Sequence, residues 1–295
     1  MATLVAAFAV PLARRRLRVH PAVTVALITA GPVALAILRP RTKARDAALF
    51  ALQMWAFTIA HELPYDDPAA LRRRLRIRYP IRIDRAIGGG ELPTVRLQRR
   101  LSKLGEPSGL DRVLTIVHWA WFIEPHLALT WILVRHNDRF AAAARQMAAA
   151  YDLGCVVYAL LPTAPPWWAA EEGYAAAPVR RVMVEVGEPI WGRAWPFMYD
   201  TLGGNPWAAF PSLHFGTSAL AAILLAESGG IEGVAGWAYT GTLGFALVYL
   251  GEHYVIDLVG GAALVAAVRL AEARLGPVAG VLSRGVQGLE RLAHG

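Results

Sequence analysis

Hydrophobic residues gather into long runs along this chain, and shorter polar stretches separate the runs. Each run is about 17 to 24 residues long, the length that a helix needs to cross the hydrocarbon core of a bilayer. Small residues are mixed with Leu and Val in these runs, so neighbouring helices can approach closely. The pattern predicts an all-α bundle of six to seven transmembrane helices, at roughly 21–38, 46–62, 111–134, 140–161, 211–227, 232–250 and 254–272.

Two polar segments lie between the predicted spans, and both are expected to lie along the membrane surface. Residues 63–110, the basic interfacial segment, contain five prolines and a run of three glycines that interrupt regular structure. Within it, residues 69–77 predict a short amphipathic helix with apolar side chains toward lipid and arginines toward phosphates. Residues 162–210 hold five of the ten tryptophans, and indole rings are favoured at headgroup level. Because no repeat or long linker divides the chain, residues 1–295 are expected to form a single membrane domain.

The composition agrees with a membrane protein and narrows its partners. The 295 residues are 56% hydrophobic, and their mean hydropathy is +0.38. The net charge of +8 is concentrated above all in the basic interfacial segment, which is expected to contact anionic lipid headgroups. Nucleic acid is disfavoured as a partner because no stacking aromatic residues alternate with these arginines. Cys155 is the single cysteine, so neither an intramolecular disulfide nor a cysteine-based metal site is expected.

The charges give a relative orientation more clearly than an absolute one. The apolar stretch 2–13 precedes the first arginine cluster, so the N-terminus does not resemble a cleaved signal peptide and is expected to be retained. The basic loops 39–45 and 135–139 fall on one side, which the positive-inside tendency makes cytoplasmic. The N-terminal arginines and the basic interfacial segment fall on the other side and oppose this assignment. We expect a multi-pass protein of the plasma or inner membrane with an outward-facing site, and the orientation of its N-terminal half stays open.

Two histidines and a carboxylate lie at the ends of apolar runs, where ionisable groups are more often kept for function than for stability. His253 and Asp257 are four residues apart, and on a helix this spacing lets the carboxylate orient the imidazole for nucleophilic or base chemistry. Ser212 can cap a helix that carries His214 in its first turn, beside free N–H groups that bind anions. The hairpin at 227–233 returns the chain, so both histidines are predicted to share one face of the membrane.

Other interpretations of these residues remain open at this point. His253 and Asp257 can be a surface pair or a capped helix start, and His214 can lie at a hydrated helix end. A transporter could use intramembrane His, Asp and Glu as a proton relay, although no paired repeat is visible. A His/Asp metal site is disfavoured because no H-x3-H or H-E-x-x-H spacing occurs. The stretch Glu124-Pro125-His126 predicts a proline break that can open toward a cavity.

The stretches Phe210-Pro211-Ser212-Leu213-His214 and His253-Tyr254-Val255-Ile256-Asp257 resemble the second and third signature motifs of the type 2 phosphatidic acid phosphatase superfamily. Together with P-x-A-P-P-W at 162–167, they are most similar to the inositol phosphorylceramide synthase branch. The resemblance covers residues 150–270, the expected catalytic core. It is specific, because two motifs occur in the right order at the right helix ends.

The resemblance implies a covalent mechanism in two halves, with no metal and no other cofactor. His253 attacks the phosphorus of a membrane lipid, Asp257 holds the imidazole, and His214 protonates the departing oxygen. His214 then takes a proton from water or from an acceptor alcohol that attacks the phosphohistidine. Water would make the protein a lipid phosphate phosphatase, whereas an alcohol would make it a phosphotransferase. The branch favours transfer of a headgroup such as inositol phosphate, and leaves the donor, the acceptor and the oligomeric state open.

The chain departs from the family pattern in its cations. Many relatives place an arginine six residues before the nucleophilic histidine, where Leu247 stands here, and the K-x6-R-P motif is not evident. Positive charge for the phosphoryl oxygens must therefore come from elsewhere. The expected substrate-binding residues are Ser212, Arg193, Arg180, Arg181, Arg78, Arg82 and Arg85, with Asp200 and Asn205 for a headgroup hydroxyl. Asp200 and Asn205 can instead belong to a turn whose side chains satisfy their own backbone.

Overall fold

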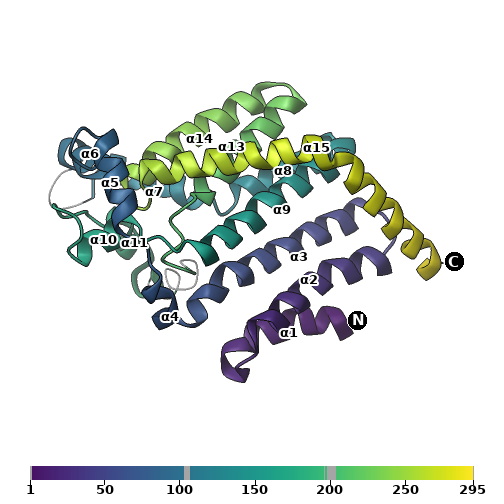
Figure 1. The fold of residues 1–295 in the computed structure, drawn as a ribbon. Coiled ribbons are helices and arrows are strands. Elements are labelled where there is room, and N and C mark those ends of the chain that lie inside the picture. Colours follow the sequence, from purple (N-terminus) through teal and green to yellow (C-terminus); the bar gives the residue numbers. More distant parts are fainter. Residues whose placement is uncertain (1, 103–106, 196, 198–203, 295) are drawn as a thin grey trace.

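Helices form the regular structure of the described residues, which are 2–102, 107–195, 197 and 204–294 of the computed structural model (Figure 1). No strand occurs in these residues, so the all-α prediction is confirmed. The longer helices are α1 (Ala2–Leu17), α2 (Pro21–Leu38), α3 (Lys43–Glu62), α7 (Gly109–Ala120), α8 (Glu124–Arg135), α9 (Asn137–Leu160), α13 (Leu213–Ser228), α14 (Ile231–Tyr249) and α15 (Val255–His294). The shorter ones are η1 (Leu63–Asp66), α4 (Pro68–Arg73), α5 (Arg78–Ile87), α6 (Pro93–Leu101), α10 (Pro166–Glu171), α11 (Val182–Trp191) and η2 (Gly192–Ala194).

Every predicted span coincides with helical structure, but one of them is divided. The span expected at 111–134 is two helices, α7 and α8, separated by a turn at residues 121–123. Pro125 lies at the start of α8, where its missing N–H leaves no intrahelical hydrogen bond unmade. The break predicted from Glu124-Pro125-His126 is therefore present. Among the described helices, α2 alone is both long and apolar enough to cross a membrane by length and composition, with a mean hydropathy of 2.1.

The bundle core lies where α8, α9, α13 and α14 meet. Its largest cluster of buried apolar side chains includes Leu129, Met147, Leu220 and Leu243. Helices α13 and α15 pack closely against each other at Gly216 and Gly261. A Cβ added at Gly261 would lie 2.4 Å from the backbone oxygen of Ser212. This approach brings the N-terminal ends of α13 and α15 together.

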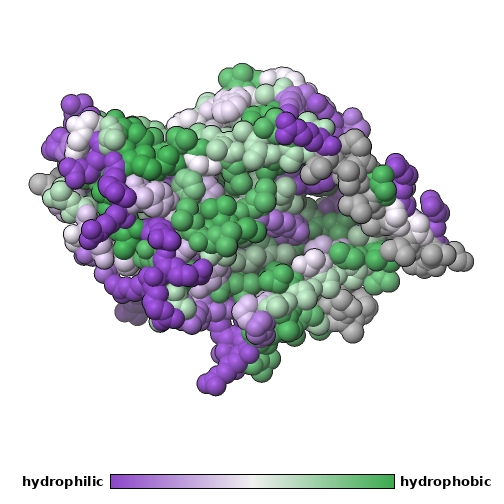
Figure 2. Space-filling view, in the orientation of Figure 1, coloured by the Kyte–Doolittle hydropathy of each residue, from purple (hydrophilic) through white to green (hydrophobic). Residues whose placement is uncertain are grey.

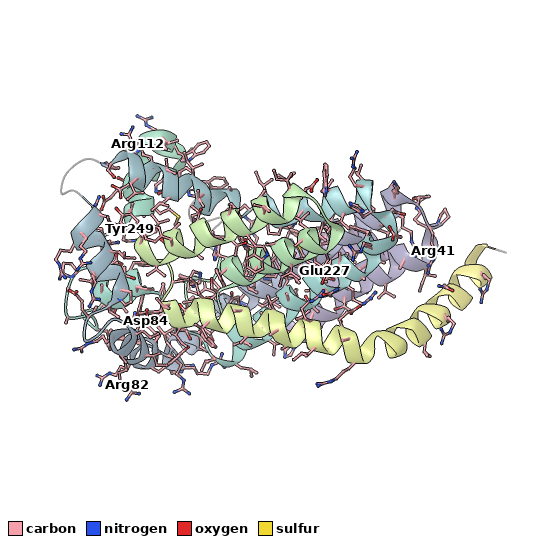
Figure 3. All side chains as sticks on the ribbon, turned by 90° about the horizontal axis from the view of Figure 1, so that it is seen from above. Arg41, Arg82, Asp84, Arg112, Glu227 and Tyr249 are labelled. Atoms are coloured by element: carbon pink, nitrogen blue, oxygen red, sulfur yellow. The ribbon has the colours of Figure 1, made fainter. Side chains whose placement is uncertain are left out.

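The short helices α4, α5, α6, α10 and α11 gather at one end of the bundle (Figure 1). Backbone hydrogen bonds join three separate segments there: the Arg76 N–H donates to Pro162 O over 2.8 Å, and the Thr163 N–H donates to Trp207 O over 2.8 Å. The turn between α2 and α3 lies at the opposite end, where Arg41 is seen, while Asp84 and Tyr249 mark the end with the short helices (Figure 3). The bundle therefore has two different ends.

The amphipathic helix predicted at residues 69–77 is wrong in its boundaries and in its exposed face. Helix α4 ends at Arg73, and Leu71 is only 1% exposed, so this leucine packs inside the protein rather than toward lipid. The amphipathic helix of the basic interfacial segment is α5, which buries Ile81 and Asp84 and exposes Arg82. The spacing of apolar residues over so few positions fits an amphipathic helix at α4 or at α5, so only tertiary packing decides which side chains are buried.

Candidate active site

A cavity of about 690 Å³ lies at the end of the bundle that carries the short helices. Its lining residues come from α3, α7, α8, α9, α10 and α11, from the start of α13, from the segment before α13, and from the turn between α14 and α15. The histidines in its wall are His61, His118, His126, His214 and His253. Two carboxylates, Glu62 and Glu252, also line it, and within the described part of the chain no lysine or arginine does.

His214 is held in the first turn of α13 by capping. The Ser212 Oγ accepts a hydrogen bond from the Phe215 N–H over 3.2 Å, the N-cap arrangement that Ser favours. The Ser212 N–H in turn donates to the backbone oxygen of Asp257 over 2.9 Å, which ties the start of α13 to the start of α15. The His214 ring packs on Trp121, with 4.1 Å between centroids. His214 therefore lies in the first turn of a helix capped by Ser212, as predicted, and the contact with Trp121 limits the movement of its ring.

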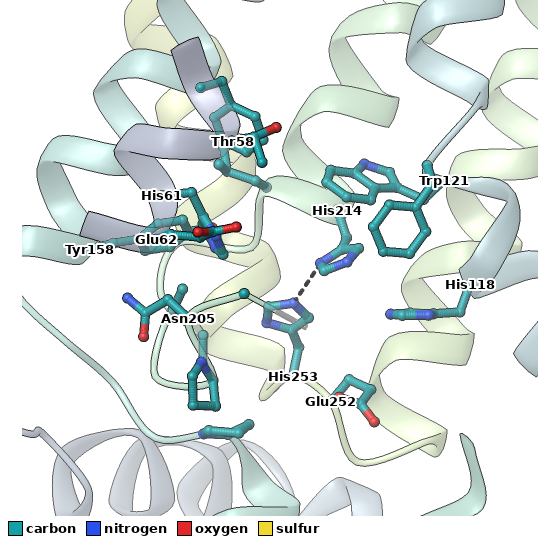
Figure 4. A pocket seen from close by; sticks show the side chains of 18 of the residues that line it. Thr58, His61, Glu62, His118, Trp121, Tyr158, Asn205, His214, Glu252 and His253 are labelled. Carbon is teal, nitrogen blue, oxygen red and sulfur yellow. Dashed lines mark hydrogen bonds between the residues drawn. The ribbon is translucent and has the colours of Figure 1, made fainter. Parts of the chain in front are cut away.

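His253 lies in the turn between α14 and α15 and is next to His214 in the cavity wall (Figure 4). The distance from His253 Nε2 to His214 Nδ1 is 3.1 Å, so these two nitrogens share a proton in a hydrogen bond. On the other side of the ring, His253 Nδ1 lies 3.4 Å from Asp257 Oδ2. The structure thus brings together the three residues that the sequence singled out, and it places both imidazoles in one cavity.

These distances favour one tautomer of His253. A carboxylate facing Nδ1 favours a proton on that nitrogen, which leaves the lone pair on Nε2. The Nε2 lone pair then accepts the proton that His214 Nδ1 donates. In this arrangement the lone pair of His253 Nε2 points at the proton of His214, and a group that enters between the two rings would meet a nucleophilic nitrogen on one side and a proton on the other.

Asp257 also serves as a helix cap, so the capped-start interpretation applies alongside the site interpretation. The Tyr254 N–H donates to Asp257 Oδ2 over 2.8 Å. The next two N–H groups of α15 are satisfied by a different helix: Val255 and Ile256 donate to the two oxygens of Asp84, over 2.8 and 3.0 Å. Asp84 belongs to α5 and is completely buried. Sequence reasoning missed this residue because its partners are about 170 residues away in the chain.

None of the arginines predicted to bind phosphate lines the cavity. Arg193, Arg78, Arg82 and Arg85 are exposed. Figure 3 shows Arg82 on the outer side of the bundle end. Surface helices of an interfacial segment turn their charged side chains to solvent, because burying a guanidinium without a paired anion is costly.

Arg180 and Arg181 are engaged beside the cavity rather than in it. Arg180 forms an ion pair with Glu185. Arg181 stacks on Trp167, with its Cζ 3.8 Å from the ring centroid, and lies 3.6 Å from Glu171. Its charge also reaches Glu252 in the cavity wall, where it acts to lower the pKa of that carboxyl.

The polar residues predicted to bind the substrate have different positions. Ser212 is fully buried and caps α13, so its hydroxyl does not face the cavity. Asn205 does line the cavity. Its Oδ1 accepts from the Trp207 N–H over 3.0 Å, as the turn interpretation requires, while its Nδ2 is buried without a partner among the described atoms. Asp200 lies outside the described residues.

Several residues of the cavity wall were not singled out from the sequence. Burial raises the pKa of the Glu252 carboxyl to about 7. Glu62 is paired with Arg14 of α1, over 2.7 Å. The His61 ring contacts Tyr158, and the His118 ring contacts His214. These residues lie at or near the ends of predicted spans on the same side of the bundle. Comparing the residues at all span ends in the sequence could have identified them.

Comparison with known proteins agrees with this geometry. No curated protein and no solved structure matches the chain. The family model of the PAP2 superfamily matches residues 105–271, a region that contains His214, His253, Asp257 and His118. The match covers more than half of the 295 residues, and the inositol phosphorylceramide synthase branch is not distinguished by it. The chain belongs to the PAP2 superfamily.

Proposed function

We propose that this protein is a multi-pass membrane phosphotransferase that moves a phosphate-bearing headgroup from a lipid to an alcohol through a phosphohistidine. Membership of the PAP2 superfamily suggests phosphatase or phosphotransferase activity. The single observation that carries the proposal is the 3.1 Å contact between His253 Nε2 and His214 Nδ1 in a cavity, with Asp257 behind His253. A nucleophile, a proton carrier and an orienting carboxylate are the parts that covalent catalysis needs.

In the first half-reaction the phosphorus enters between the two imidazoles. The His253 Nε2 lone pair forms a bond to phosphorus, and the bond from phosphorus to the lipid oxygen breaks. The electron pair of that bond goes to the leaving oxygen, which takes the proton of His214. The products are a lipid alcohol and a phosphoryl group on His253, with the Asp257 carboxylate stabilising the charge on the imidazole.

The second half-reaction returns every group to its starting state. The oxygen of an acceptor alcohol attacks phosphorus and loses its proton to His214. The bond from phosphorus to nitrogen breaks, and its electron pair returns to His253 Nε2. Positioned proton transfer of this kind is worth about 100- to 10,000-fold in rate.

A bilayer environment is supported by the outer faces of the helices. Large apolar side chains are exposed along α7, α8, α9 and α14, and a contiguous apolar surface of this kind is unusual for a protein surrounded by water. Figure 2 shows the apolar band between the polar ends of the molecule. The exposed residues include Val113, Ile116, Leu127, Val134, Val156, Leu160, Val234 and Trp237.

The cavity favours a lipid phosphodiester as the donor. Apolar and aromatic side chains such as Met54, Phe57 and Phe122 form much of its wall, which suits the lipid part of a substrate. Glu62 is already paired with Arg14, and no described lysine or arginine lines the cavity, so a doubly charged phosphate monoester would find no cation in its wall. A diester carries a single negative charge and suits this wall better. Transfer of a headgroup, such as the inositol phosphate that the branch suggests, is therefore favoured over release of inorganic phosphate.

The test is an exchange assay with purified protein in lipid nanodiscs. Headgroup-labelled phospholipids and long-chain alcohols are supplied, and both inorganic phosphate and new phosphodiester are followed over time. We expect a new phosphodiester and an acid-labile phosphoenzyme, and the His253→Ala variant should lose at least about 1,000-fold in turnover. His136→Ala, in the turn before α9, is the matched histidine control.

Three outcomes separate the alternatives. Inorganic phosphate without a new phosphodiester would replace the transferase with a lipid phosphate phosphatase. Turnover of the His253→Ala variant equal to that of wild type would remove the proposed nucleophile, whichever product forms. Absence of both products from the wild-type protein, with every lipid class supplied, would refute phosphoryl transfer itself.

A further inference from the structure

We propose that His118 is a third catalytic histidine, which donates an N–H to an oxygen of the transferred phosphoryl group in place of the missing arginine. The inference rests on the proposed function, because it concerns the charge that develops on phosphorus-bound oxygens during transfer. Enzymes stabilise such charge with donors that are already oriented in a site of low polarity. The cavity contains no described lysine or arginine that could do so.

His118 occupies the position that this task requires. It lies in the last turn of α7, is 4% exposed and lines the cavity. Its ring centroid is 4.8 Å from that of His214, which in turn is 5.2 Å from that of His253. Figure 4 shows His118 projecting into the cavity from the side opposite His61 and Asn205. His118 therefore borders the same cavity as the two imidazoles between which the phosphoryl group would lie.

The hydrogen bonding of His118 is incomplete in the described structure. Its Nδ1 is buried and has no hydrogen-bond partner among the described atoms. A buried polar group without a partner costs about 1–3 kcal/mol, so such groups persist where a ligand or a reacting group completes them. A phosphoryl oxygen is an acceptor that suits an imidazole N–H. No described protein group therefore fixes this nitrogen of the ring, and the His118 side chain that lines the cavity is free to donate an N–H to a bound phosphoryl group.

The other histidines of the cavity wall differ in their surroundings. His61 is in ring contact with Phe57 and Tyr158, and His126 is in ring contact with Phe50. His118 contacts the proton carrier itself. This difference selects His118 as the donor and makes His126 a suitable comparison, since its Nδ1 is also buried without a described partner.

The backbone around His118 is held rigidly, as a preoriented donor requires. Helix α7 begins with a capping box, in which Ser108 and Asp111 satisfy each other's backbone N–H groups. Near its other end, the Tyr239 hydroxyl of α14 donates to Val117 O over 3.0 Å. These contacts fix the backbone of the helix that presents His118 to the cavity.

The experiment compares His118→Leu with His118→Asn in the full-length protein in nanodiscs. Leucine fills a similar volume without a donor, whereas asparagine restores an N–H close to the position of Nδ1. The rate constant of phosphoenzyme formation is measured in single turnovers with the headgroup-labelled phospholipid that the wild type uses. We expect a fall of about 100- to 1,000-fold for leucine, the usual effect of removing one such donor, and a rate within about tenfold of wild type for asparagine.

Controls separate this inference from the function on which it rests. Loss of phosphoenzyme in the His253→Ala variant supports His253 as the nucleophile. If the wild-type protein forms no phosphoenzyme, the proposed function is wrong, and that result is distinct from a failure of the His118 inference. If the leucine variant forms phosphoenzyme at a rate within about threefold of wild type, the proposed role of His118 is wrong, and the proposed function itself is unaffected. His126→Leu is expected to fall less than His118→Leu, and an equal fall would also overturn it.

The asparagine variant keeps the test decisive if the leucine variant does not fold. An Asn variant that folds, as judged by thermal unfolding, and that keeps the phosphoenzyme rate within about tenfold of wild type supports a donor role. A folded Asn variant that loses more than about tenfold shows that titration or packing of the imidazole matters instead, and this contradicts the proposal.

Discussion

The capping of α15 by Asp84 leads to a prediction about stability. Replacing Asp84 with alanine leaves the partly buried N–H groups of Val255 and Ile256 without their acceptors. Each hydrogen bond to a charged group contributes about 1.5–3 kcal/mol. Burial of the carboxylate opposes part of this gain, as the raised pKa of Asp84 indicates. We therefore expect Asp84→Ala to lower the free energy of unfolding by about 2–3 kcal/mol.

The same change should disturb catalysis, because Asp84 holds the start of the helix that carries Asp257. The assay combines denaturant unfolding in detergent micelles with turnover in nanodiscs, and we expect kcat to fall more than KM rises. Arg82→Gln, on the exposed face of the same helix α5, is the matched control and should leave stability nearly unchanged. An Asp84→Ala variant as stable as this control would refute the capping argument.

Two further predictions concern the loop beside His253 and the contact between α13 and α15. Burial raises the pKa of Glu252 to about 7, so the folded state binds this proton more tightly than the unfolded state and stability falls as pH rises from the usual carboxyl value toward 7. Glu252→Gln should therefore lose less thermal stability than wild type between about pH 5 and about pH 8, and equal losses would contradict the assignment. Gly261→Ala should destabilise the protein by about 1–3 kcal/mol and lower turnover, because the added Cβ meets the Ser212 backbone. Gly241→Ala, where nothing lies within 4 Å of the added Cβ, is its control, and equal unfolding curves for the two would show that the close approach is unimportant.

The helices were largely predictable from the sequence, because long apolar runs determine helices locally. The predicted spans coincide with helical structure, and the break before α8 follows from Pro125. The exposed face of the basic interfacial segment was not predictable. Leu71 and Ile81 are both apolar residues next to arginines, and only the packing of α4 and α5 against the rest of the protein shows how each is buried.

The contact between His214 and His253 was predictable because both residues lie at helix ends that the hairpin returns to one side. The phosphate-binding arginines were not, and their predicted role has no support from the described cavity wall. A count of charges along the chain cannot tell an exposed guanidinium from one that enters a cavity. Arg181 illustrates this, because a stacking contact with Trp167 holds it beside the site.

The sequence by itself determined where the long helices lie, and it singled out His214, His253 and Asp257 as a set that would come together. Those properties depend on short-range patterns, namely run length, capping residues and four-residue spacing. Only the tertiary structure decided that His118 lies against His214 and that Asp84 caps α15. Contacts between residues far apart in the chain arise from helix packing, and side-chain packing in three dimensions has no signature in local sequence.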